Sequence, residues 1–307
     1  MSLFQLFTSK GPSGFGYGST AEQVTAGLSL EGKTFLLTGC NSGLGREALR
    51  VLTMRGGRVV GTARTVEKAK VACDAVSGNT VPLACELSDP ASVRACVAEV
   101  KRQGIKLDAI ICNAGIMGVR TEQAFGYELQ FFTNHIGHFI LVTGLLDQLT
   151  DTGRVVMLSS SAHTMAPKEG IQFDNLAGKK GHSDWGSYGQ SKLANLLFAK
   201  ELARRFAGTK KTANAVHPGV VHTNLGRHTN PVFMFLFGLF GPLGLKSVSQ
   251  GAATEVYVAT SPATATVSGA YFANCNLAKS RADADDAVLA KKLWDVSERI
   301  VAALPGN

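Results

Sequence analysis

Tyr188 and Lys192 stand four residues apart in the segment GSYGQSKLANLLFAK (186–200). On a helix, side chains with this spacing share one face. A free phenol has a pKa of about 10, and a neighbouring cation favours its phenolate form. The pair could therefore move a proton; alternatively, it is the solvated edge of an ordinary helix. Helical periodicity predicts that four leucines face a core: Leu193, Leu196, Leu197 and Leu202.

A glycine-rich turn, TGCNSGLG (38–45), follows an apolar run and precedes a helical pattern. Its glycines have GxxxGxG spacing: Gly39, Gly43 and Gly45. They let the backbone turn sharply and aim the N–H groups at the start of the next helix toward a pyrophosphate. Between a first strand and a first helix, such a turn predicts a dinucleotide site. A merely tight turn is the alternative.

Arg64 follows the second apolar run, in GTARTVEK. At this place an acidic residue would bind a ribose 2′-hydroxyl, whereas an arginine accommodates a 2′-phosphate. No Asp or Glu competes for the position, and Arg46 could add a second positive charge. The sequence therefore predicts NADP(H) rather than NAD(H) as the cofactor; a plain surface arginine is the alternative.

Strands and helices alternate regularly from Lys33 onward. Strands are expected at 33–39, 58–63, 80–85, 107–115, 153–160, 211–219 and near 268–273. Helices are expected at 44–54, 66–76, from Asp89 or Pro90 to 103, over a long stretch ending near Leu149, at 186–206 and before the last strand. Apolar strands in this order predict an α/β fold: a single Rossmann-type, doubly wound parallel sheet of about seven strands with helices on both faces. Residues 1–30 form an N-terminal extension to one catalytic domain, 31–307.

Composition narrows the class further. The chain has 307 residues, 45% of them hydrophobic, and a net charge of +8. The basic residues are scattered without interleaved aromatics, which argues against nucleic-acid binding. The six cysteines show neither CxxC nor zinc-ligand spacing, so we expect free, buried thiols, no metal and a reducing compartment. No secretory signal is visible, which favours a cytoplasmic location.

An uncharged segment, TNPVFMFLFGLFGPLGL (229–245), calls for a membrane test. Its 17 residues reach only the lower limit for a spanning helix, and glycines and a proline interrupt it. We expect a substrate lid over about 224–246, or a segment that dips into a membrane interface. Its aromatic side chains suit an apolar substrate: Phe233, Phe235, Phe237 and Phe240.

Several motifs occur in one order and together resemble the short-chain dehydrogenase/reductase family over about residues 30–302. They are TGxxxGxG at 38–45, NAG at 113–115, Asn134 in TNHIGHF, Ser160 in VVMLSSSAH, Tyr188 and Lys192 in YGQSK, and HPG at 217–219. Within that family, NHIGHF, SSSAH and HPGVVHTNL resemble the retinol-dehydrogenase-like branch. That branch includes the WW-domain oxidoreductase and a plant relative at the chloroplast inner envelope, which the chain's early and late segments resemble most.

The resemblance implies a catalytic role for four residues. Tyr188 exchanges a proton with the substrate oxygen, and Lys192 supports it and binds the nicotinamide ribose. Ser160 holds the substrate oxygen, and Asn134 holds a water on the proton path. Three serines are adjacent and alternate in direction along a strand, so Ser160 is chosen by its place in the motif.

The resemblance and the glycine turn together imply a set of cofactor contacts. They are Gly39, Asn41, Ser42, Gly43, Leu44, Gly45, Arg64, Glu86, Leu87, Asn113, Ala114, Gly115, Tyr188, Lys192, Pro218, Gly219, Val221 and Thr223. Glu86 departs from the aspartate that the family often carries, so its adenine contact is expected to be shifted or absent. We assign the nearby histidines to packing and hydrogen bonding: His135, His138, His163, His217 and His222.

The sequence thus predicts an NADP(H)-dependent oxidoreductase acting on a small apolar carbonyl or alcohol. Retinal-like, steroid and long-chain aldehyde or ketone substrates all fit. The alternative is a regulatory protein that senses the dinucleotide while docked on a membrane or protein complex. Peripheral membrane association and a homodimer formed through the long helices are both left open.

Overall fold

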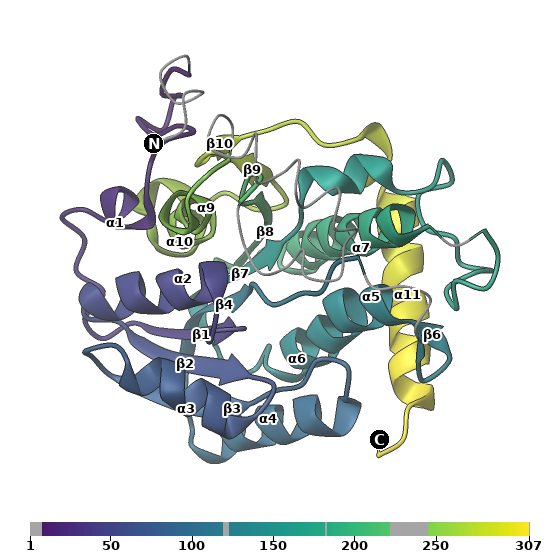
Figure 1. Ribbon diagram of the computed structural model, residues 1–307, viewed down its shortest axis with the longest axis horizontal. Helices are drawn as coiled ribbons and strands as arrows, with labels where there is room; N and C mark the ends of the chain where they lie inside the picture. Colours follow the sequence, from purple (N-terminus) through teal and green to yellow (C-terminus); the bar gives the residue numbers. More distant parts are fainter. Residues whose placement is uncertain (1–7, 119–122, 182, 222–244, 307) are drawn as a thin grey trace.

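The computed structural model describes residues 8–118, 123–181, 183–221 and 245–306. Its centre is an eight-stranded sheet in the order β10-β9-β8-β7-β4-β1-β2-β3 (Figure 1). Neighbouring strands are parallel except for the pair β9–β10. The strands are β1 Thr34–Thr38, β2 Arg58–Ala63, β3 Thr80–Ala84, β4 Leu107–Cys112, β7 Leu149–Leu158, β8 Thr212–His217, β9 Tyr271–Ala273 and β10 Asn276–Leu277. The doubly wound α/β fold is confirmed, and short β10 adds one antiparallel strand to the seven parallel ones.

Helices cover both faces of the sheet (Figure 1). One face carries α1 Ala21–Val24, α2 Gly43–Met54, α3 Val66–Asp74, α9 Val248–Gly251 and α10 Ala253–Thr260. The other carries α4 Pro90–Arg102, α5 Leu129–Phe131, α6 Gly137–Gly144, α7 Asp184–Arg205 and α11 Ala287–Ala303. Strand side chains alternate between the two cores: Phe35 and Leu37 face the first, and Leu36 the second.

The strand order reverses between β1 and β4. The chain runs outward from β1 through β2 to β3, then returns to β4 and continues through β7 to β8. The ends of the parallel strands are in register, with Cys112 beside Met157 and Leu158 beside Val216. Open sheets of this kind bind ligands at the carboxyl edge where the order reverses.

Two elements differ from the sequence-based expectation. The stretch after β4 does not become one long helix; it first forms a hairpin of β5 Gln123–Ala124 and β6 Tyr127–Glu128. Phe125 and Gly126 both have positive φ (51° and 83°), which turns the chain back. Helix α11 was not expected at all, although it packs beside α7 (Figure 1).

Helix α7 buries the predicted leucine face, but its burial is not confined to that face, because every residue from Tyr188 to Ala199 is buried. It begins at Asp184 after Ser183, whose side chain accepts a hydrogen bond from the N–H of Gly186. Its predicted core leucines are all fully buried: Leu193, Leu196, Leu197 and Leu202. Over this stretch α7 is therefore a core helix rather than an amphipathic surface helix.

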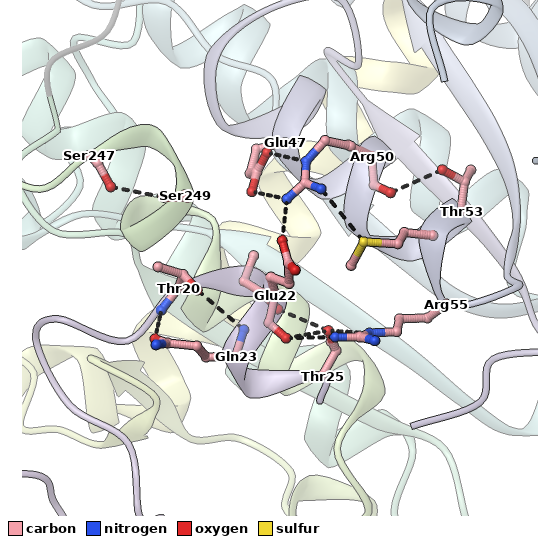
Figure 2. A network of polar contacts seen from close by, with 12 residues as sticks. Thr20, Glu22, Gln23, Thr25, Glu47, Arg50, Thr53, Arg55, Ser247 and Ser249 are labelled. Carbon is pink, nitrogen blue, oxygen red and sulfur yellow. Dashed lines mark hydrogen bonds and ion pairs between the residues drawn. The ribbon is translucent and has the colours of Figure 1, made fainter. Parts of the chain in front are cut away.

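The N-terminal segment 8–30 packs on the domain through polar contacts at α1 (Figure 2). Arg50 of α2 pairs with Glu47 at 2.9 Å and with Glu22 at 3.1 Å. Arg55 donates to the carbonyl oxygen of Glu22 at 2.9 Å. Exposed ion pairs stabilise weakly, so the buried side chains of Ala21 and Val24 supply the larger share.

Within the described ranges, no helix is long and apolar enough to span a membrane. The expected lid falls almost wholly on residues 222–244, which lie outside the described residues together with its phenylalanines. The lid, the cytoplasmic location and the homodimer stay predictions.

Glu255 in α10 is fully buried, and neither carboxylate oxygen has a hydrogen-bond partner. Burial raises its pKa from the ordinary 4.5 to about 8. The folded protein therefore holds a proton that the unfolded chain releases between these pH values. By linkage, the stability falls as pH rises through this window and levels off above it.

We expect Glu255→Gln to be increasingly more stable than the native chain between pH 5 and pH 8.5, because the amide does not ionise. The gap in Tm should widen by about 5 °C or more across this range, measured by thermal denaturation. Exposed Glu31→Gln is the control and should show a constant gap. A gap for Glu255→Gln that does not change with pH contradicts the account.

Candidate active site

Tyr188, Lys192 and Ser160 come together at the carboxyl edge of the sheet. Both α7 residues are buried, and the Lys192 Nζ lies 5.6 Å from the centroid of the Tyr188 ring. The Lys192 Nζ donates a hydrogen bond to the carbonyl oxygen of Leu158, the last residue of β7, at 3.0 Å. The Ser160 side chain lies close enough to the Tyr188 hydroxyl to counteract part of the rise in its pKa.

The three adjacent serines point in different directions. The Ser159 Oγ donates to the carbonyl oxygen of Lys192 at 2.7 Å and so faces the backbone of α7. Ser161 is exposed, and its backbone N–H donates to the Nδ1 of His217 at 3.2 Å. Of the three, Ser160 is the one whose side chain acts on the pKa of Tyr188, and its catalytic role stays a prediction.

Asn134 lies in a π-helical turn, Phe132–Ile136, between α5 and α6. Its side chain donates to Ile116 O at 3.0 Å and to Ser191 Oγ at 2.9 Å, and accepts from Ile116 N–H at 2.8 Å. A Cβ on Gly115 would lie 3.1 Å from Asn134 Oδ1 and 3.4 Å from Lys192 Nζ. The lack of a side chain at 115 thus leaves room between the Asn134 amide and the Lys192 ammonium.

Burial shifts the pKa of both groups on α7. It raises the pKa of Tyr188 to about 12, although the Ser160 side chain opposes the shift, and it lowers the pKa of Lys192 to about 8. The expected lowering of the tyrosine pKa by the lysine is absent here. The physical reason is that the Lys192 ammonium turns to the Leu158 carbonyl instead of the phenol oxygen. Tyr188 therefore carries its proton at neutral pH.

The glycine turn has the geometry of a phosphate cradle. Gly39 and Gly43 have positive φ, 72° and 51°, which favours glycine. A Cβ on Gly45 would collide with the carbonyl oxygen of Gly39 and lie 2.6 Å from Asn113 Nδ2. No side chain caps the start of α2, and the preceding residues Asn41 and Ser42 are exposed. The free N–H groups of the first turn suit a pyrophosphate.

A buried hydrogen-bond network, which the sequence did not reveal, connects the turn to Asn134. Asn113 Nδ2 donates to the Thr38 carbonyl at 2.8 Å, and the Ala114 N–H donates to Thr38 Oγ1 at 3.0 Å. Thr38 Oγ1 lies 3.0 Å from His138 Nε2, and His138 Nδ1 donates to the carbonyl oxygen of Asn134 at 2.9 Å. Burial lowers the pKa of His138 to about 4, so this histidine is neutral and structural.

On the adenosine side of the expected site, Arg64 is available to a ligand, whereas the Glu86 carboxylate is engaged within the protein. Arg64 is exposed directly after β2, open to a ligand. The Glu86 carboxylate accepts from both the N–H and the Oγ of Ser88, at 3.2 and 2.9 Å. This carboxylate is already hydrogen-bonded within its own loop, and Leu87 packs against Gly137 of α6.

The end of β8 meets the start of α2. Gly219 has φ 91° and follows Pro218, and Val221 pairs with Lys246 in an isolated bridge. A Cβ on Gly251 would lie 2.6 Å from both Leu44 Cδ2 and Val221 Cγ2, so all three residues meet closely. Thr223, the remaining expected cofactor contact, lies outside the described residues, as does His222.

Among the described residues, no group of His, Cys, Asp and Glu side chains is arranged so that it could hold a metal ion. All six cysteines are buried and free, as expected: Cys40, Cys73, Cys85, Cys96, Cys112 and Cys275.

A doubly wound sheet with a glycine turn at its switch point and a Ser–Tyr–Lys group at the same edge defines a class of nicotinamide-dependent oxidoreductases. A family model described as short chain dehydrogenase matches residues 33–232. The chain belongs to the short-chain dehydrogenase/reductase family, whose members bind a nicotinamide dinucleotide and act on small carbonyl or alcohol substrates.

Relatives match over nearly the whole chain. The chain is 39% identical to the short-chain dehydrogenase TIC 32 A, chloroplastic, of Brassica napus, over 99% of this chain and 100% of that protein. It is 37% identical to human retinol dehydrogenase 14, over 90% and 88% of the two chains. A crystal structure of an uncharacterised Mycobacterium paratuberculosis protein matches with a TM-score of 0.76 and 32% identity, over 93% and 98%.

We expect Gly45→Ala to weaken NADPH binding at least tenfold and to lower Tm, because its Cβ meets backbone that cannot move aside. Gly186→Ala is the matched control: it lies in a helix, its Cβ would meet Ser183 Cβ at an ordinary 3.4 Å, and Tm should hold or rise. Titration calorimetry and thermal denaturation measure both. Equal NADPH affinity in the two variants would contradict the claim that the glycine turn binds the pyrophosphate.

Proposed function

We propose that the protein is an NADP(H)-dependent oxidoreductase that interconverts the carbonyl and alcohol forms of an apolar substrate. Retinal-like compounds, steroids and long-chain aldehydes or ketones are the candidate substrates. The observation that carries the proposal is the convergence of Tyr188, Ser160, Lys192 and Asn134 beside the glycine turn. The 37% identity to retinol dehydrogenases supports an apolar substrate.

The residues present fit a dinucleotide phosphate. The uncapped start of α2 would bind the pyrophosphate, and exposed Arg64 would pair with a 2′-phosphate. Gly115 and Lys192 would border the nicotinamide ribose. When bound, the nicotinamide ring supplies or accepts the hydride.

The protein's own side chains would carry out the proton transfer. Ser160 donates a hydrogen bond to the substrate oxygen and aligns it with Tyr188. With its pKa at about 12, Tyr188 is protonated and can donate its proton to that oxygen during reduction. The Lys192 cation stabilises the phenolate that remains, and a water held by Asn134 would return the proton. Alcohol oxidation reverses these transfers.

We expect Tyr188→Phe to lower kcat/KM for NADPH-dependent reduction by about 10²–10⁴-fold, because it removes the proton donor. A carbonyl panel that includes all-trans-retinal, run with NADPH and with NADH, measures this. Affinity for NADPH should change less than about threefold. Buried Tyr257→Phe, in α10 on the opposite face of the sheet from α7, is the matched control and should keep its activity. Unchanged turnover by Tyr188→Phe would falsify the mechanism.

We expect Arg64→Ser to weaken NADPH binding about tenfold to a hundredfold and to leave NADH binding unchanged, since a charged hydrogen bond contributes about 1.5–3 kcal/mol. Exposed Arg299→Ser serves as the control for loss of one positive charge. Calorimetric titration with both dinucleotides gives the answer. If the affinities for NADPH and NADH fall equally, Arg64 does not determine which of the two cofactors is bound.

A further inference from the structure

Two thiols meet beside the glycine turn: Cys40 lies within the turn, and Cys73 lies in the last turn of α3. A Cβ on Gly61 of β2 would lie 3.0 Å from Cys73 Sγ and 3.1 Å from Cys40 Sγ. Both sulfurs therefore border the space that a side chain at 61 would take, and their separation cannot exceed the sum of these two distances. The glycine at 61 lets the two thiols approach each other across β2.

The two thiols differ in acidity. The Cys40 thiol, and to a smaller extent the side chain of Thr80, lowers the pKa of the Cys73 thiol to about 7, although burial opposes the shift. The Cys73 thiol, together with burial, raises the pKa of Cys40. Cys73 is thus partly thiolate at neutral pH, and the thiolate is the form of cysteine that reacts with oxidants.

Cys73 lies close to the surface, although its side chain is covered. Helix α3 packs on β2 and on β3, which is the edge strand of the sheet (Figure 1). The helix ends at Asp74, and residues 75 and 77–79 after it are exposed. Opening of the last turn of α3 exposes the thiol without disturbing the rest of the sheet, and such local openings require far less free energy than global unfolding.

The turn that carries Cys40 is tightly held. The Cys40 N–H donates to the Thr62 carbonyl at 3.0 Å, and Gly45 packs directly on the carbonyl of Gly39. A disulfide brings its two sulfurs to about 2.05 Å, closer than any non-bonded contact. Its formation would draw the turn and α3 together, and α3 begins two residues after Arg64. The bond would therefore displace both parts of the expected phosphate site.

We propose that Cys40 and Cys73 form a reversible disulfide that weakens dinucleotide binding when a peroxide oxidises the protein. The inference rests on the proposed NADPH site, because that is the site the bond would distort. In a reducing compartment a disulfide of this kind is transient, as is usual for thiols that sense oxidants.

The chemistry needs one peroxide and two thiols. The Cys73 thiolate attacks a peroxide oxygen, the O–O bond breaks, and Cys73 becomes a sulfenic acid while hydroxide leaves. The Cys40 sulfur then attacks the Cys73 sulfur, so that the S–S bond forms and the S–O bond breaks. The proton of the Cys40 thiol leaves with the hydroxyl group as water. The two sulfurs are oxidised and the peroxide is reduced; a dithiol such as dithiothreitol reverses the disulfide.

Peroxide treatment of the full chain, followed by alkylation and peptide mass spectrometry, tests the proposal. We expect a Cys40–Cys73 crosslink that dithiothreitol removes. Calorimetric titration of the same samples should show an NADPH affinity about tenfold or more lower in the oxidised protein than in the reduced protein. Cys73→Ala should keep the NADPH affinity of the reduced protein and lose its response to peroxide.

Cys85→Ala is the matched control. Cys85 interacts with Cys96 in a second pair of buried thiols, on the opposite face of the sheet from Cys40 and Cys73. The Cys96 thiol and burial raise the pKa of Cys85, so this pair is poorly reactive. The control should therefore respond to peroxide as the native chain does. Thermal denaturation of the reduced variants shows that each is folded.

Three results overturn the proposal: no Cys40–Cys73 crosslink, a crosslink that leaves NADPH affinity unchanged, or loss of NADPH binding on oxidation of Cys73→Ala. The crosslink and the affinity of the native chain decide the matter even if a variant does not fold. A reduced protein that does not bind NADPH would contradict the proposed function together with the switch, whereas a missing crosslink in a protein that binds NADPH contradicts the switch alone.

Discussion

The buried ammonium of Lys192 is the constraint on which the site depends. A charge in the interior is costly unless it is hydrogen-bonded, and the Leu158 carbonyl at the end of β7 provides the bond at 3.0 Å. The Asn195 side chain donates to the same oxygen at 3.1 Å. In the other direction, the Ser159 hydroxyl donates to the backbone carbonyl of Lys192. Helix α7 is thereby locked to β7 in one register, and Tyr188, one turn earlier, is placed beside Ser160.

Close backbone approach is the second requirement, and small residues meet it at both sides of the switch point. Gly45 lets α2 start directly against the turn at Gly39, and Gly115 leaves room between Asn134 and Lys192. The Thr38–His138 pair then ties the end of β1 to the helix that bears Asn134. The phosphate cradle and the proton-transfer group are thus parts of one hydrogen-bonded edge.

The sequence predicted those elements whose conformation is determined by residues close together in the chain. Strand β2 and helix α7 follow from apolar runs and periodicity, and the turn at 38–45 follows from its glycines. The hairpin at Phe125–Gly126 was missed because its residues also fit a helical pattern, and α11 because its contacts are with residues about 100 positions away. The Thr38–His138 bond and the tyrosine pKa depend on tertiary burial, which no spacing in the sequence encodes.

Transfer of deuterium tests the central claim most directly. The protein, NADPH deuterated at C4 of the nicotinamide on either face, and each carbonyl of the panel are incubated, and the alcohol is analysed by mass spectrometry. The account predicts one deuterium at the former carbonyl carbon from one of the two labelled faces only. Alcohol without deuterium from either face, or no alcohol from any carbonyl, would contradict it.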